Sequence, residues 1–380
     1  MNSIPLDLFY EIFSRLPAKS IGRCRCVSEQ WRSILCSADF TEYCSTNSRP
    51  SLLFAMRKFN SSAFLFFSSP QIQSRPSSLA APYFELNLPL YFCGHASGLF
   101  CFRRMKMTTM EMREDTVEHV ICNPCMGQYV FLPKLKTTSY RSFLGFDPID
   151  KAFKVLSPYS SSSAYILTFG TGERRWRKIH FPLDHKPSSE GICINGALYY
   201  LAREAYAPTN FIACFDVRSE KFKVIQEERL TDSDATLINY KGKLSAISLS
   251  QEEVRIWVLE DDEKQDWSEY AYTLPGDKFR DVECDVLKVY VAGVTSATGE
   301  IVLMNLNYQH PPGPFYVFYF HPERNVIKRV EVQGFGCHGA VDAFVDHVDD
   351  LRFDIKSWQP DVPRFESINK YNALRLLEDM

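Results

Sequence analysis

Long apolar runs and an excess of positive charge are both missing from this sequence. Its 380 residues include 43 Lys and Arg against 46 Asp and Glu, a formal net charge of −3, whereas general nucleic-acid binding usually needs a strongly basic face. No run is long enough for a membrane span. Asp7, Glu11 and Arg15 interrupt the start, where a secretory signal needs an unbroken apolar stretch. We therefore expect an intracellular protein, in the nucleus or the cytoplasm, that binds neither nucleic acid nor membrane.

The residue patterns of metal sites, phosphate loops and catalytic nucleophiles are also missing. Cys122 and Cys125 form a C-x-x-C with His119 before them, but no second pair follows at the spacing of a zinc finger. The Gly-rich pieces GTGERR and GHASGLF lack the Lys-Ser/Thr ending of a phosphate loop. We expect no metal, no cofactor and no catalytic residue, and cysteines that serve as small buried hydrophobes. A hydrolytic enzyme is the rival interpretation, although His321 and His347 stand alone in the sequence.

The first 40 residues have the pattern of short helices. Leu8, Ile12 and Leu16 recur at every fourth position, and Phe9 and Phe13 form a parallel row beside them. Three such helices cannot hide this many large apolar side chains among themselves, because about 40 residues is near the lower limit for an independent fold. We expect a module that a partner protein completes; an ordinary helical cap on the following domain is the alternative.

From about residue 51 the pattern changes to short strands joined by turns. Five segments have the form of a hairpin: 120–133, 165–179, 211–225, 254–270 and 317–331. A different hairpin precedes several of them, at 94–102, 191–202 and 235–247, with Asn-Gly or Lys-Gly as the tight turn of the last two. Two hairpins make a four-stranded unit that recurs roughly every 45 to 50 residues, which predicts a kelch-like β-propeller of about six blades.

The two ends of this β-region each lack a complete blade. We therefore predict that a strand near residues 340–345 pairs with strands from residues 51–69 and closes the ring. An open ring would leave bare strand edges, and such edges promote aggregation.

Residues 4–40 resemble the F-box. The motifs that carry the resemblance are Ile4-Pro5, Asp7-Leu8, Glu11-Ile12-Phe13, Arg15-Leu16-Pro17, Arg25-Cys26-Val27-Ser28 and Trp31. The resemblance implies docking on a Skp-type adaptor. The family's interface positions correspond here to Ile4, Pro5, Leu8, Ile12, Leu16, Val27 and Trp31. A helix that docks in a groove needs apolar anchors at this spacing.

The remainder is similar to the F-box-associated domain of plant F-box proteins, the type 3 group expanded in the mustard family. The motifs GHASGLFCF, ICNPCMGQYVFLP, FLGFDPIDKAFKVL and CFDVRSEKFKVI are among those that carry this resemblance. The fold expected is mainly β, with a small three-helix F-box before the propeller. We divide the chain into an F-box at 1–45, a linker and first strands at 46–90, the F-box-associated β-domain at 91–355 and a C-terminal tail at 356–380.

Together the two resemblances imply a substrate-recognition subunit of an SCF-type (Skp–cullin–F-box) ubiquitin ligase. Its partners would be a Skp-type adaptor, through it a cullin, and an unidentified protein substrate marked for degradation. Such a subunit is not an enzyme, because bringing the target close to a charged ubiquitin-conjugating enzyme is itself a large rate effect. The alternative is an adaptor-binding scaffold or competitor that acts outside any ligase, since both roles use the same adaptor surface.

Overall fold

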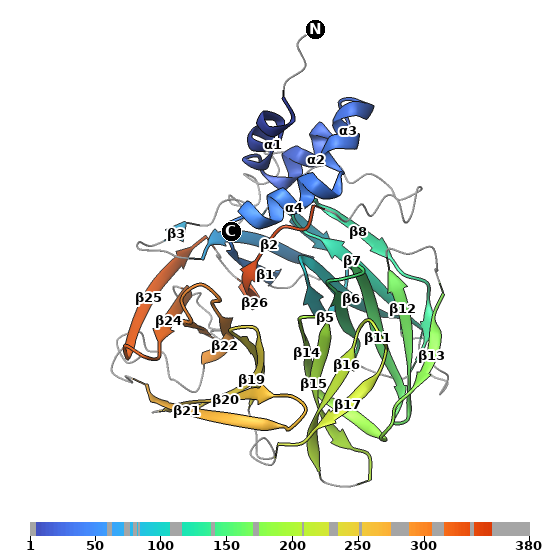
Figure 1. Cartoon of the computed structure of the whole chain (residues 1–380), viewed down its shortest axis with the longest axis vertical. Coiled ribbons are helices and arrows are strands. Elements are labelled where there is room, and N and C mark those ends of the chain that lie inside the picture. Colours follow the sequence, from blue (N-terminus) through green and yellow to red (C-terminus); the bar gives the residue numbers. More distant parts are fainter. Residues whose placement is uncertain are drawn as a thin grey trace.

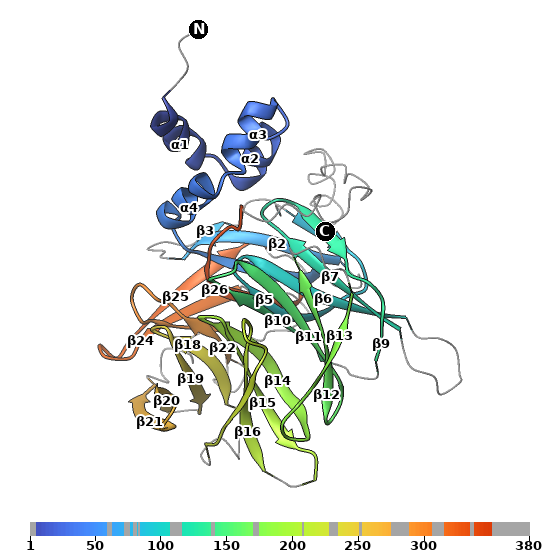
Figure 2. The ribbon, with the colours of Figure 1, turned by 45° about the vertical axis from the view of Figure 1, so that its right-hand side comes forward.

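The part of the chain that the structure describes forms a propeller of six sheets with four helices at one side (Figure 1). The computed structural model describes residues 5–58, 63–71, 77–78, 82, 84–106, 116–137, 141–169, 175–206, 209–227, 235–250, 253–274, 289–305, 315–334 and 338–351. The helices are α1 (Leu6–Ser14), α2 (Ala18–Cys24), α3 (Glu29–Leu35) and α4 (Ala38–Asn47). Figures 1 and 2 show α4 next to the propeller, with α1 and α3 farther out. The fold is therefore mainly β, as predicted.

Each blade is a sheet of antiparallel strands, to which blade 6 adds one parallel strand, β3, and the first strand of each blade lies nearest the axis. Blades 1 and 2 contain β26 (His338–His347), β1 (Ser51–Lys58), β2 (Ala63–Pro70) and β4 (Phe84–Asn87), then β5 (Tyr91–Ala96), β6 (Leu99–Lys106), β7 (Thr116–Asn123) and β8 (Gln128–Phe131), with β9 (Leu135–Lys136) beside β7. Blades 3 and 4 contain β10 (Phe143–Asp147), β11 (Ala152–Ser160), β12 (Ser163–Phe169) and β13 (Arg177–His180), then β14 (His185–Ile194), β15 (Ala197–Glu204), β16 (Asn210–Asp216) and β17 (Phe222–Ile225). Blades 5 and 6 contain β18 (Thr236–Tyr240), β19 (Lys243–Leu249), β20 (Glu253–Asp261) and β21 (Asp266–Thr273), then β22 (Val289–Val294), β23 (Ile301–Asn305), β24 (Phe315–His321), β25 (Val326–Gln333) and β3 (Ser77–Ser78).

Blade 1 takes strands from both ends of the β-region. β26 pairs antiparallel with β1, with Phe54 opposite Ala343 and Met56 opposite Val341. The same face of β1 packs against blade 6, where Phe54 contacts Phe315 edge to face with the ring centroids 6.2 Å apart. The predicted closure of the ring is therefore confirmed, and it uses backbone pairing and apolar packing together.

The outer hairpins repeat one turn chemistry. The last residue of the third strand accepts a hydrogen bond from the backbone N–H three positions on: Asp216 from Ser219 at 2.6 Å and His321 from Arg324 at 3.4 Å. Asp261 makes the same contact in blade 5. A side chain that mimics a backbone turn explains why residues with a hydrogen-bond acceptor, two Asp and one His, stand at these three positions. The five outer hairpins predicted from sequence are confirmed as β7–β8, β12–β13, β16–β17, β20–β21 and β24–β25.

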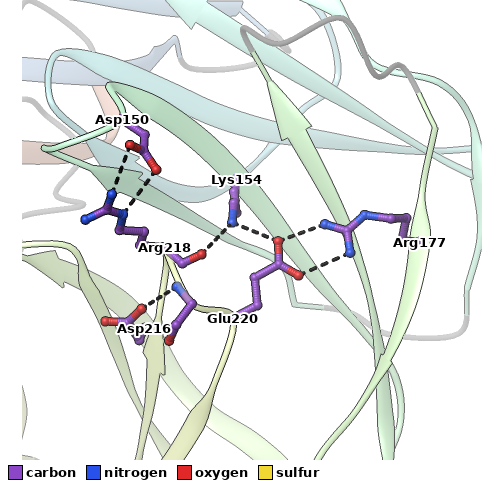
Figure 3. A network of polar contacts seen from close by, with 7 residues as sticks. Asp150, Lys154, Arg177, Asp216, Arg218 and Glu220 are labelled. Atoms are coloured by element: carbon purple, nitrogen blue, oxygen red, sulfur yellow. Dashed lines mark hydrogen bonds and ion pairs between the residues drawn. The ribbon is translucent and has the colours of Figure 1, made fainter.

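Apolar layers between neighbouring blades hold the ring together, and an ion-pair network adds to the layer between blades 3 and 4 (Figure 3). The Glu220 carboxylate accepts hydrogen bonds from Lys154 Nζ and from Arg177 Nη2, each at 2.7 Å. Arg218 and Asp150 form a second pair on the exposed side, at 3.2 Å. The turn of one blade is thus tied to the strands of the blade before it.

Two elements differ from what the sequence indicated. A fourth helix, α4, follows the three expected ones, because Ser37 accepts a hydrogen bond from the Phe40 N–H and caps its start. β3 was not predicted as a strand, and it pairs parallel with β25. Ile4 and the tail proposed at 356–380 lie outside the described residues.

Candidate functional site

Helix α1 has one buried and one exposed apolar row. Phe9 and Phe13 are buried and stack with their ring centroids 4.2 Å apart. Both rings meet Trp31 of α3 edge to face, at 5.8 and 4.9 Å between centroids. Pro5 and Pro17 stand directly before α1 and α2, where the missing proline N–H costs no helical hydrogen bond. The inward row of α1 thus builds the core of the helical module.

The other apolar row of α1 faces solvent. Leu6, Leu8 and Ile12 are 52%, 51% and 53% exposed, and Val27, between α2 and α3, is 64% exposed. Large apolar side chains left bare in this number on so small a module indicate a protein-binding surface. Burying one of them fully is worth about 1.5 to 3 kcal/mol. These four residues are called the apolar docking face below.

A cavity of about 360 Å³ lies where the propeller axis meets α4. Thr41 and Ser45 of α4, His95 of β5 and His347 of β26 are among the residues that line it. Burial, together with the neighbouring His347, lowers the pKa of His95 to about 4, so the His95 imidazole is neutral at physiological pH. The cavity offers packing and hydrogen bonds to a small group or to one side chain of a partner.

Comparison with known proteins identifies both parts of the chain. Residues 1–43 match the F-box domain, and residues 51–350 match the F-box associated beta propeller domain. The chain is an F-box protein of this propeller family. It is 45% identical to F-box protein At3g57590 of Arabidopsis thaliana, over 93% of this chain and 92% of that one. It is 42% identical to F-box protein At2g15640 of the same plant, over 92% and 94%.

Among solved structures, the chain is similar to TolB from Acinetobacter baumannii, with a TM-score of 0.43 and 8% sequence identity. That match covers 84% of this chain and 73% of TolB. Within the described helices, none combines the length and apolarity needed to cross a bilayer.

The residues predicted from the F-box pattern fall into two groups. Pro5, Leu8, Ile12 and Val27 are exposed, whereas Leu16 and Trp31 are half-buried and pack against the core of the module. Sequence reasoning missed Leu6, which is as exposed as Leu8. Leu6 lies two positions before Leu8, so it falls outside the four-residue spacing of Leu8, Ile12 and Leu16, and it is not among the positions that the F-box resemblance indicated.

The C-x-x-C pair lies in the β7–β8 hairpin and packs rather than reacts. Burial raises the pKa of Cys122 and Cys125 well above the ordinary value, so both remain thiols. The Cys125 thiol donates to Asn123 Oδ1 at 2.8 Å. Among the described residues, no three His, Cys, Asp or Glu side chains are grouped as metal ligands.

His119 and Ser142 are placed like a base and a nucleophile but are closed off from solvent. His119 Nε2 lies 2.8 Å from Ser142 Oγ, which donates to Ser157 Oγ at 3.2 Å. All three side chains are buried, and burial lowers the pKa of His119 to about 3. A substrate cannot reach this pair, so its hydrogen bonds serve to join strands.

Proposed function

We propose that this protein is the substrate-recognition subunit of an SCF-type ubiquitin ligase and has no catalytic residues of its own. The F-box would dock on a Skp-type adaptor and through it on a cullin, in the nucleus or the cytoplasm. The propeller would hold a target protein for ubiquitination and degradation. We also propose that the chain belongs to the type 3 group of plant F-box proteins that is expanded in the mustard family.

The apolar docking face supports this proposal most directly. The F-box already fills its own core with Phe9, Phe13 and Leu35, so the exposed Leu8 and Ile12 have no packing role inside the chain. Exposed apolar positions four residues apart on one helix suit insertion into a groove on a partner. The proposed adaptor contacts are Ile4, Pro5, Leu8, Ile12, Leu16, Val27 and Trp31, with Leu6 added; Leu16 and Trp31 would act by supporting the exposed residues.

The division of labour follows from the two surfaces. Residues 1–45 carry the adaptor contact, and the β-domain at 91–355 presents turns and loops on a rigid frame, the usual arrangement for recognition. Ubiquitin transfer then needs no catalytic group from this chain. Holding the target next to the ubiquitin-loaded conjugating enzyme replaces an encounter between two freely diffusing molecules, which by itself accelerates the reaction.

Replacing Leu8 and Ile12 together by Asp tests the docking proposal. Burying two unpaired charges in an apolar groove costs several kcal/mol, so we expect adaptor affinity to fall by at least about a hundredfold. Binding of the full chain to a purified Skp-type adaptor is measured by calorimetry.

Ile149→Asp serves as the matched control. Ile149 is 66% exposed on the β10–β11 turn, so the same chemical change is made away from the F-box and adaptor binding should be unchanged. Circular dichroism verifies that both variants fold. Undiminished adaptor binding by a folded Leu8→Asp/Ile12→Asp chain would refute the proposed docking face. The scaffold alternative is tested separately by co-purification: a wild-type chain that brings down the adaptor without a cullin would favour a scaffold outside the ligase.

A further inference from the structure

The F-box and the propeller share an apolar core. Cys125 and Met126, in the turn between β7 and β8, pack with the F-box helices, as does Leu351. Leu351 ends the strap, defined here as residues 348–351 directly after β26. Gly22 of α2 comes so close to this turn that a Cβ there would lie 3.0 Å from Met126 Cε. The F-box thus packs on two propeller segments that are far apart in sequence, the β7–β8 turn and the strap, which together are called the seat below.

Arg25 joins the strap to the F-box from inside this seat. Its side chain is buried, and its Nη2 donates to Leu351 O at 2.6 Å and to Leu35 O at 2.9 Å. Its Nε donates to Leu35 O as well, at 3.2 Å. A buried guanidinium that bridges two backbone carbonyls fixes their separation, because its donors form a rigid fork.

Asn123 holds the strap from the propeller side. It occupies the turn position that Asp216 and Asp261 occupy in other blades, and its Oδ1 accepts the Met126 N–H at 3.2 Å as theirs accept a turn N–H. Its Nδ2 also donates to Asp350 O at 2.7 Å. An ionised Asp can only accept, so only the amide serves both the turn and the strap.

The strap is enclosed on its other side by the β5–β6 turn. Gly98 has a φ of +80°, and a Cβ on it would lie 2.8 Å from Val348 O and 2.9 Å from Asp350 N. The strap therefore lies between this turn, Asn123 and Arg25, and any displacement of it breaks contacts on both sides.

We infer that Arg25 and Asn123 are positioning residues for ubiquitin transfer, which hold the F-box and the propeller as one rigid body through the strap. This inference rests on the proposed function. Domains joined by a small interface move relative to each other by default. A fixed orientation keeps a bound target at one distance from the conjugating enzyme, which sustains a high effective concentration. Loss of the seat should spoil transfer while leaving adaptor binding intact.

Two variants remove the strap contacts, and each has a matched control. Asn123→Asp keeps the acceptor for the turn but loses the donor to the strap. Asn195→Asp makes the same change at a hairpin turn where the amide donates to Gly242 O, away from the F-box. Arg25→Met removes the bridge, and Arg23→Met changes an exposed arginine on the same segment.

The measurement is the distance distribution between spin labels carried by non-natural amino acids at Ser33 and Tyr206, both exposed, in the full chain with and without a Skp-type adaptor. We expect one narrow distribution for wild type and both controls. Asn123→Asp and Arg25→Met should broaden it about twofold, as two loosely joined domains would. In the assembled ligase, mass spectrometry should find the chain's own ubiquitinated lysines spread over more positions in these two variants, with adaptor affinity unchanged.

Distributions and lysine patterns equal to wild type in both folded variants would overturn the inference. If these variants do not fold, Gly98→Ala replaces them, with Gly242→Ala as control. Gly242 has nearly the same φ, +83°, but nothing closer to its Cβ position than 3.9 Å. The spin-label distance distribution should then broaden in Gly98→Ala and stay as narrow as that of the wild type in Gly242→Ala. A wild-type chain that does not bind adaptor refutes the proposed function, while the distances in the free chain still decide whether the seat exists.

Discussion

At the scale of single residues, the Glu220 carboxylate connects blade 4 to two cations of blade 3. Glu220 has a left-handed backbone, with φ of 59°, and its carboxylate meets the two cations, Lys154 and Arg177. Burial by itself raises the pKa of Glu220, but the hydrogen bonds and charges of Arg177 and Lys154 outweigh it and leave the pKa below its ordinary value of 4.5. The folded state therefore binds this proton more weakly than the unfolded state does.

Glu220→Gln should lower the free energy of unfolding by about 1 to 2 kcal/mol at neutral pH. The loss comes mainly from Lys154, which is nearly buried and loses its counter-charge. The ion pair with Arg177 contributes less, because Arg177 is more exposed and solvent screens its charge. Because the folded pKa lies below the unfolded one, the contribution is fully present above the unfolded pKa. It disappears as the pH falls through 4.5 toward the folded pKa. Urea denaturation at several pH values checks this.

The control for this pair is Glu253→Gln, which removes an exposed ion pair with Arg255 and should have no measurable effect. A stability difference between wild type and Glu220→Gln that stays constant, or grows, below pH 4.5 would contradict the assignment.

At the scale of elements, β26 is the strand on which the ring depends. It supplies the inner strand of blade 1, and without it β1 would present an unpaired edge to the axis. Its residues also contribute Val341 and Ala343 to the apolar layer between blades 6 and 1. Removing β26 therefore removes a hydrogen-bonded ladder and part of a core at once.

A chain ending at Gly334 should be insoluble or melt far below the full-length protein, because bare strand edges pair with other chains. Soluble yield and thermal denaturation provide the measurement. A chain ending at residue 355 retains β26 and the strap and is the comparison. Equal melting of the Gly334 chain and the full-length protein would show that the ring does not need this closure.

The elements that could be predicted from the sequence are those whose side chains form an apolar pattern or a recognisable turn. Hairpins such as β16–β17 and β20–β21 have apolar runs on either side of an Asp-led turn. Helix α4 was missed because its buried face has only Phe40, Thr41 and Cys44, too few for a periodic pattern. β3 was missed because two serines paired through their backbones carry no apolar pattern. Backbone pairing of polar residues cannot be recognised from side chains alone.

At the scale of the whole molecule, the F-box and the propeller are not separable pieces. Deleting residues 1–40 would cut into α4 and uncover Met126 and Leu351, which the F-box now buries. Sequence predicted the exposed anchors Leu8 and Ile12 from their spacing. It did not predict the seat: Arg25 and Asn123 both stand in family motifs, but they bind backbone carbonyls of the strap, and a motif does not show which carbonyls its side chains reach.

The full-length Leu8→Asp/Ile12→Asp chain should therefore act as a target-protecting competitor. It keeps the propeller and its seat but cannot reach the ligase, so a target named by proximity labelling should live longer in cells that express it. The measurement is target half-life, with Ile149→Asp as the control. An unchanged or shortened half-life, with the variant folded and bound to the target, would count against a receptor role.

The strap follows directly from the strand that closes the ring, and this has a consequence during protein synthesis. Arg25 leaves the ribosome 326 residues before its acceptor Leu351 does, a delay on the order of 15 to 60 s at ordinary translation rates. Throughout that time the F-box lacks the strap, and of its propeller contacts only the β7–β8 turn can be in place. Secure seating of the F-box thus reports that translation has passed the ring-closing strand, and a prematurely terminated chain carries an F-box that lacks its strap.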